Sequence, residues 1–188
     1  MPVQTKAQTL TTTECAVLGL LTRGPMSGYD LKKAVETSVG YFWAPAKSQI
    51  YAVLPRLVEA GYATSKKVAQ PQRPDKQVYR ITAHGREVFK KWIDDTPTPP
   101  EPNRNLLLLK LYFGDLSSPE RLAEHVRERR SAAQELKAEL QAFDAAPCGD
   151  PDLDFHANLT RRYGHAVVNA IIRWADETER ELAKRGET

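Results

Sequence analysis

The apolar positions at the beginning of the chain follow a helical spacing that is broken at regular points. Thr11 with Glu14 three residues later has the form of a capping box, which predicts a first helix with an apolar inner face. Ser27 with Asp30 repeats that arrangement and predicts a second helix, which we expect to end at Gly40. Two short helices in succession are the first sign of a small helical domain.

The third helix has the sharpest periodicity in the chain. Its apolar residues fall at positions i, i+3, i+4, i+7 and i+8, and Gly61 terminates the pattern. These residues are Ile50, Val53, Leu54, Leu57 and Val58. The opposite face is polar and is therefore available for another partner.

Two strand-like runs follow, at residues 62–68 and 77–81. The polar, proline-bearing stretch 69–76 between them is predicted to be a hairpin loop. A fourth helix is predicted over residues 83–95. The expected order is therefore helix, helix, helix, strand, strand, helix.

A proline-rich stretch, residues 96–104, separates this first block from a purely helical second block. We expect a short apolar helix over residues 105–113, a long helix that begins at Ser118 and a last helix over about residues 152–184. The sequence thus predicts a mainly α protein with one domain at 1–95, a linker at 96–104 and a second domain at 105–188.

The two long helices carry apolar stripes that have no third partner within the chain, so the simplest partner is a second copy of the chain. This argument predicts a homodimer formed through residues 105–188. The side chains that we expect at its interface are Leu136, Leu140, Phe143, Leu159, Tyr163, Val167, Ile171 and Trp174.

Charge is distributed unevenly over the 188 residues. Residues 1–95 hold 14 Lys and Arg against 8 Asp and Glu, whereas residues 96–188 hold 13 against 16. Within residues 46–80 there are seven basic and two acidic side chains. A basic region confined to one end of the chain favours contact with a polyanion at that end.

Other classes of protein are disfavoured. No nucleophile, base and acid occur at catalytic spacing and no phosphate-binding glycine loop occurs, so an enzyme is not expected. Asp152, Asp154 and His156 imitate a metal site by spacing alone, and we expect no metal and no cofactor.

The expected setting is the cytoplasm. Apolar runs such as Leu106 to Leu109 are far too short to span a bilayer, and residues 1–13 have no signal-peptide pattern. The two cysteines, Cys15 and Cys148, form no disulfide framework.

Three helices followed by a basic two-stranded hairpin form the winged variant of the helix-turn-helix, in which the third helix enters the major groove of DNA. Hydroxyl and amide side chains can contact base edges, a small side chain permits close approach, and lysines on the hairpin neutralise phosphates. The amide end of the second helix offers another phosphate seat. The predicted DNA-binding residues are Ser27, Tyr29, Lys47, Ser48, Gln49, Tyr51, Ala52, Arg56, Lys66, Lys67, Arg73 and Lys76.

An ordered set of short motifs over about residues 10–92 resembles the PadR-like family of bacterial transcriptional regulators. The motifs are Val17-Leu18-Gly19-Leu20-Leu21, Ser27-Gly28-Tyr29-Asp30-Leu31, Ser48-Gln49-Ile50-Tyr51, Leu54-Pro55-Arg56-Leu57, Glu59-Ala60-Gly61-Tyr62 and Tyr79-Arg80-Ile81-Thr82-Ala83-His84-Gly85-Arg86. The second half, with Arg162-Tyr163-Gly164 and Trp174-Ala175, resembles the longer branch of the family, which includes virulence-gene regulators. The resemblance implies a homodimeric repressor that binds an inverted-repeat operator and is released by a small effector, aromatic or otherwise.

Two other hypotheses remain open from the sequence. The winged domain could serve as a protein-interaction module, although the basic balance of residues 46–80 counts against this use. The chain could also be a redox-sensing regulator that uses Cys148.

Overall fold

A computed structural model describes residues 10–70, 73–100, 104–145 and 149–186, and leaves the side chains of Gln70, Arg73 and Pro74 undescribed. The chain divides into two compact units, residues 1–99 and 100–188. The boundary falls inside the proline-rich stretch that the sequence marks as a linker. We describe each unit by itself.

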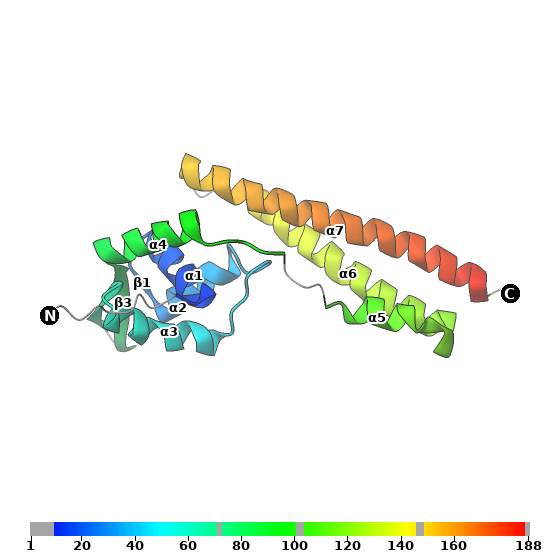
Figure 1. Ribbon diagram of the computed structural model, residues 1–188, viewed down its shortest axis with the longest axis horizontal. Coiled ribbons are helices and arrows are strands. Elements are labelled where there is room, and N and C mark those ends of the chain that lie inside the picture. The colour runs from blue at the N-terminus through cyan, green and yellow to red at the C-terminus, as the bar shows by residue number, and fades with distance from the viewer. Residues whose placement is uncertain (1–9, 71–72, 101–103, 146–148, 187–188) are drawn as a thin grey trace. The chain divides into compact units, whose positions relative to one another are not determined.

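The first unit has the element order that the sequence predicts, with one additional strand. Its three-stranded antiparallel sheet has the order β1-β3-β2, and helices pack beside it (Figure 1). The elements are α1 (Thr12–Leu21), β1 (Met26–Ser27), α2 (Gly28–Glu36), α3 (Lys47–Glu59), β2 (Ala63–Gln70), β3 (Arg73–Ile81) and α4 (Ala83–Asp95). The winged helix-turn-helix architecture is confirmed.

Both predicted capping boxes are present. The backbone N–H of Glu14 donates to the Thr11 hydroxyl, and a Glu14 carboxylate oxygen accepts from the Thr11 N–H at 2.8 Å. Ser27 and Asp30 make the equivalent pair of bonds at the start of α2. Each box satisfies backbone amides that the first turn of a helix leaves without intrahelical partners.

The apolar stripe of α3 lies in the core of this unit. Ile50, Val53, Leu54 and Leu57 are buried in one cluster with side chains from α1, α2 and the sheet. Pro55 lies on the exposed side of the same helix, where its ring disturbs no core packing. Burial of one face of α3 therefore leaves its polar face at the surface, as the periodicity predicts.

The predicted hairpin loop at residues 69–76 is too long. The strands β2 and β3 run to Gln70 and from Arg73, with a register irregularity between Val68 and Gln70. A two-stranded ribbon keeps its ladder when both faces are solvated, so polar side chains do not end it. Pro74 is tolerated because β1 pairs with β3 only at Val78 and Tyr79 and leaves that edge of β3 open further along.

The second unit is helical. It contains α5 (Leu106–Tyr112), a single 3₁₀ turn (Gly114–Leu116), α6 (Pro119–Asp144) and α7 (Pro151–Gly186). The predicted start of α6 is confirmed, since the Ser118 hydroxyl accepts from the Arg121 N–H and Pro119 occupies the first turn. The helices α6 and α7 pack side by side along a long contact (Figure 1).

Ion pairs fix the antiparallel register of α6 and α7. Asp144, the last residue of α6, accepts from Arg161 at 2.8 Å and lies 2.8 Å from His165. Arg130 reaches Asp176 at 2.8 Å and Glu179 at 3.0 Å. Because Asp144 lies opposite residues 161–165, the first turns of α7 extend past the end of α6.

Candidate nucleic-acid interface

The surface of α3 opposite the core carries most of the predicted DNA-binding residues of this helix. Lys47, Ser48, Gln49, Tyr51 and Ala52 are all exposed. We call these five residues, together with the exposed Tyr29 of α2, the groove face. This surface combines cationic, hydroxyl, amide and small side chains, the types that contact bases and phosphates in a major groove.

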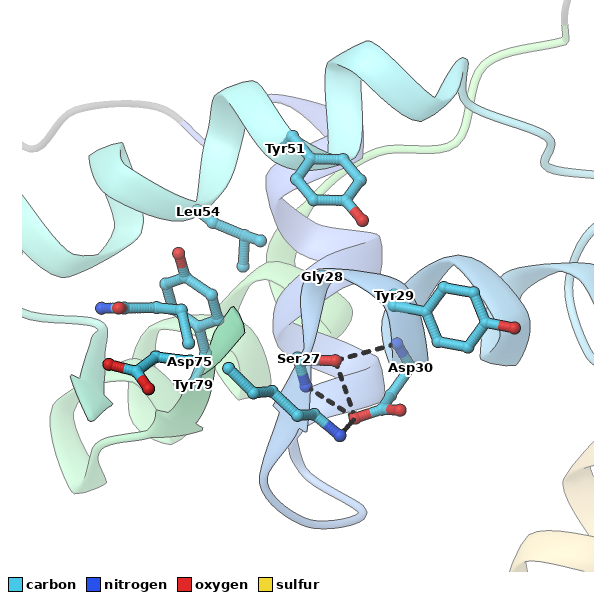
Figure 2. Close-up of a pocket in the computed structure, with 10 residues that line it drawn as sticks. Ser27, Gly28, Tyr29, Asp30, Tyr51, Leu54, Asp75 and Tyr79 are labelled. Carbon is cyan, nitrogen blue, oxygen red and sulfur yellow. Dashed lines mark hydrogen bonds and ion pairs between the residues drawn. The ribbon is translucent and has the colours of Figure 1, made fainter. Parts of the chain in front are cut away.

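Tyr51 is held in place by two neighbours. A methyl group at Gly28 would lie only 2.6 Å from a carbon of the Tyr51 ring, so the ring packs directly on the first turn of α2. The ammonium group of Lys47 lies 5.8 Å from the centre of the same ring. Figure 2 shows Tyr51 of α3 above Gly28, with Tyr29 beside it on α2. The two tyrosines remain 43% and 67% exposed and can offer their hydroxyl groups to phosphates.

A pocket of about 610 Å³ lies between the start of α2, α3 and β3, and is lined by Tyr29, Tyr51, Lys76 and their neighbours (Figure 2). At its base Lys76 Nζ lies 2.8 Å from an Asp30 carboxylate oxygen. This hydrogen bond from Lys76, joined by that from the Ser27 amide, lowers the pKa of Asp30 to about 2. Lys76 therefore connects the wing to the cap of α2.

Ser27 has a structural position rather than a surface one. The residue is buried. Its hydroxyl donates to a carboxylate oxygen of Asp30 at 2.9 Å and accepts from the Asp30 N–H. Its role in any phosphate seat is thus to fix the first turn of α2, while the exposed Tyr29 is the side chain available to a ligand.

Arg56 is likewise engaged within the protein. One of its guanidinium nitrogens lies 2.8 Å from Glu14 Oε1, and the Glu14 side chain is only 7% exposed. The arginine, which is 53% exposed, neutralises a buried carboxylate that also caps α1. The predicted DNA contact of Arg56 must therefore coexist with a role in folding.

The side-chain carbonyl oxygen of Gln49 is hydrogen-bonded within the protein. The Ala46 N–H donates to Gln49 Oε1 at 3.0 Å, which places the glutamine over the first turn of α3. Its NH₂ group keeps two donors that can face a ligand.

The wing carries Lys66 and Lys67 on adjacent positions of β2, so their side chains leave opposite faces of the ribbon. Both are exposed, and Lys67 pairs with Asp75 across the hairpin at 3.3 Å. The side chain of Arg73 lies outside the described part of the structure, so its predicted phosphate contact remains a prediction.

The predicted dimerisation residues fall into three groups. Leu159, Tyr163 and Val167 are exposed on α7, whereas Leu136, Phe143, Ile171 and Trp174 are half-buried. Leu140 is completely buried within a single chain, so it stabilises the α6–α7 pair and has no surface to offer to a second copy. The buried residues of α7 are Gly164, Val168 and Ala175, and they lie on a different side of the helix from the exposed Leu159, Tyr163 and Val167.

The remaining candidates for chemistry lie apart from this surface. Burial, with a contribution from the Glu14 charge, raises the pKa of the Cys15 thiol to about 12, which disfavours the reactive thiolate. Cys148 lies outside the described residues. Within the described ranges, no group of three or more His, Cys, Asp and Glu side chains is arranged to hold a metal ion, and no helix is both long and apolar enough to cross a membrane.

Sequence reasoning missed three features of this surface. It placed Gly28 at the amide end of the second helix but did not predict that Tyr51 packs on it, although a glycine in the first turn of a helix signals a close approach by another group. It did not pair Glu14 with Arg56, because residues 42 positions apart are brought together only by the fold. It also missed β1, which spans only Met26 and Ser27 and is too short to show a period.

Comparisons with known proteins agree with this architecture. The model of the transcriptional regulator PadR-like family matches residues 17–91, and that of the virulence activator alpha C-terminal region matches residues 103–183. The negative transcriptional regulator PadR of Bacillus subtilis is 29% identical over 126 residues, which cover 67% of this chain and 69% of that protein. A probable transcriptional regulator of Mycobacterium tuberculosis is 29% identical over 183 residues, covering 90% and 97%.

Solved structures show the same fold over nearly the whole chain. Bacillus subtilis PadR in complex with operator DNA superposes with a TM-score of 0.80 at 24% identity and covers 92% of this chain and 99% of that one. The same protein has also been solved with p-coumaric acid, with a TM-score of 0.72 at 24% identity over 92% and 99% of the two chains. The Vibrio cholerae virulence activator AphA has a TM-score of 0.72 at 29% identity, covering 93% and 99%.

Proposed function

We propose that this chain, a DNA-binding transcriptional regulator that belongs to the PadR-like family, acts as a homodimeric repressor that binds an inverted-repeat operator in the cytoplasm. The observation that carries the proposal is the polar, cationic face of α3 beside a lysine-bearing wing. Each protomer offers one such surface, and a two-fold dimer presents two of them to a duplex.

The groove face supports contact with the bases, and the wing supports contact with the backbone. Gln49 and Ser48 lie in the first turn of α3, the part of a recognition helix that meets base edges. Tyr29 at the start of α2 and Lys66 and Lys67 on β2 are exposed and suited to phosphate oxygens. Arg56 and Lys76 support these contacts indirectly, because their ion pairs with Glu14 and Asp30 help to hold α3 beside α1 and the wing beside α2.

The second unit supports dimerisation by its exposed apolar surface. The α7 stripe of Phe155, Leu159, Tyr163 and Val167 faces away from the residues that α7 buries against α6. A second group of exposed apolar side chains comes from α5 and the turn after it, and comprises Leu106, Leu108, Leu109, Tyr112, Phe113 and Leu116. Exposed apolar side chains in this number are typical of an interface, and a second copy of the chain would cover them with closed symmetry.

Repression is proposed because the Bacillus subtilis relative is a negative regulator. We also propose that a small aromatic acid releases this protein from DNA, since that same relative has been solved with p-coumaric acid. The test is a reporter gene under the selected operator, measured with and without the acid, together with DNA release in vitro. If no aromatic acid in a panel weakens DNA binding, the proposed effector is wrong.

The experiment that tests DNA binding is selection of duplexes from a random pool, followed by titration at several salt concentrations. We expect an inverted repeat bound by two chains, with an affinity that falls steeply with salt. The alternative use of the winged unit as a protein-interaction module predicts no enriched motif and no steep salt dependence.

A further inference from the structure

The start of α3 is built differently from the starts of the other described α-helices. In α1, α2, α4, α5 and α6 the side chain of a threonine, serine or asparagine at the N-cap accepts a backbone N–H. Asp150 does the same before α7. The N-cap of α3 is Ala46, whose methyl group cannot accept a hydrogen bond. The reciprocal half of the box is kept, since the Ala46 N–H donates to Gln49 Oε1 at 3.0 Å, as the Thr11 and Ser27 N–H groups donate to Glu14 and Asp30.

This hydrogen bond occupies the carbonyl oxygen of the Gln49 side chain and leaves its NH₂ group available to a ligand. The carbonyl oxygen is held by the backbone three residues earlier, so the side chain is folded back over the first turn. A glutamine that reads adenine accepts from the N6 amino group and donates to N7 at the same time. One lone pair of the anchored Oε1 is occupied by the Ala46 N–H, so this two-bond pairing would require Gln49 to reach outward and leave the exposed Ala46 N–H to water.

On the proposed placement of α3 in the major groove, on which this inference rests, we propose that Gln49 is a donor-only base reader. Its anchored amide presents the NH₂ group to the groove. Guanine offers two neighbouring acceptors there, N7 and O6, whereas adenine places an amino group beside its N7 and cytosine presents an amino group alone. Gln49 therefore selects guanine over adenine, and Ala46 is the residue that positions it.

The test uses the full-length protein and its selected duplex, with all four base pairs substituted at every position. Gln49→Ala identifies the position at which discrimination is lost. At that position the wild-type protein is expected to prefer guanine to adenine by about tenfold. Gln49→Glu keeps an oxygen for the Ala46 amide and replaces the two donors with an acceptor, so the preference is expected to move to cytosine.

Ala46→Pro removes the anchoring N–H, and the φ of −57° at Ala46 already suits proline. It frees the Gln49 carbonyl and is expected to reduce the guanine-to-adenine ratio by about threefold or more, within the range of one base contact. Ala46→Ser is the matched control, since it changes the same residue, keeps the N–H and leaves the ratio as in the wild type. Circular dichroism and thermal unfolding establish that each variant is folded.

A wild-type preference for adenine that disappears when its N6 amino group is removed would overturn the proposal. A folded Ala46→Pro variant with the wild-type ratio would overturn it as well. If Ala46→Pro does not fold, Gln49→Glu decides, because a retained guanine preference contradicts the proposal and a cytosine preference supports it. If Gln49→Ala keeps the wild-type discrimination at every position while Lys67→Ala weakens binding, the placement of α3 in the groove fails together with this inference.

Discussion

Glu14 Oε1 in α1 lies 2.8 Å from a guanidinium nitrogen of Arg56 in α3, so a buried carboxylate at the start of one helix is neutralised from the exposed side of another. The other carboxylate oxygen of Glu14 closes the cap on Thr11. One side chain thus sets both the start of α1 and the packing of α3 beside it. This relationship makes Arg56 a structural residue of the DNA-binding unit.

We expect Arg56→Met to destabilise the winged unit by about 1–3 kcal/mol, because it leaves the Glu14 charge buried without its partner. Chemical denaturation of the full chain measures the loss. Arg23→Met, which removes an equally cationic but exposed side chain, is the control and should change stability little. The pair Glu14→Gln with Arg56→Met should recover part of the loss, and no recovery would mean that the ion pair is not its cause.

The Lys76–Asp30 pair predicts a dependence on pH. The pKa of Asp30 falls from 3.8 to about 2 on folding, so its stabilisation is present above pH 4 and is lost as the pH falls toward 2. Asp30→Asn should therefore destabilise the protein at pH 7 by at most about 1 kcal/mol, since the pair is partly exposed, and by less at pH 3. The loss of stability caused by Lys76→Met should likewise be smaller at pH 3 than at pH 7. A difference that is constant from pH 7 to pH 3 would argue against the assignment.

Gln49→Ala and Lys67→Ala should affect DNA binding in different ways. Gln49 lies in the first turn of α3, and its loss should cost about 1–3 kcal/mol on the preferred duplex and relax discrimination at one position. Lys67 lies on the wing and should contact phosphate alone, so its loss should weaken all duplexes nearly equally and reduce the salt slope by about one. Titrations on specific and scrambled duplexes separate the two. Equal weakening of both duplexes by Gln49→Ala would contradict a base contact.

Tyr163→Glu should convert the proposed dimer into a monomer. Tyr163 is 69% exposed in the apolar stripe of α7, where a buried charge would be unpaired in the assembly. Sedimentation at micromolar concentration measures the change, and Arg173→Glu, at an exposed polar position of the same helix, is the control. A monomeric wild-type protein, or a dimeric Tyr163→Glu variant, would show that this stripe is not the interface.

The sequence was sufficient for the features that depend on local chemistry. Both capping boxes, the bounds of α4 and the buried stripe of α3 follow from residues three or four positions apart, and short motifs carry the resemblance to the PadR-like family. The predicted end of the second helix at Gly40 was wrong, since α2 ends at Glu36 and turns follow it. The length of the wing was wrong, because polar residues and Pro74 normally end a strand but are tolerated in a ribbon that is solvated on both faces.

What could not be read from the sequence depends on contacts between distant residues. Arg56 and Lys76 have the composition of DNA contacts, and only the fold brings them to Glu14 and Asp30. Similarly, the apolar stripes of α6 and α7 do not reveal which residues face each other. The structure assigns Leu140 to the pairing of these helices and leaves Tyr163 exposed. Periodicity identifies an apolar face, but it does not choose between an internal and an external partner.

In the proposed complex, two copies of α3 enter the major grooves of one duplex. Ala52 is exposed in the middle of the groove face, so an iron-chelate cleaving group attached to Ala52→Cys in a Cys148→Ser background would cut the DNA wherever α3 lies. The buried Cys15 thiol, with its raised pKa, is protected from labelling. We expect two symmetry-related sets of cuts in the selected operator, in major grooves about one helical turn apart or more. A single set of cuts in one half-site, or intact DNA under a bound and labelled protein, would contradict the account.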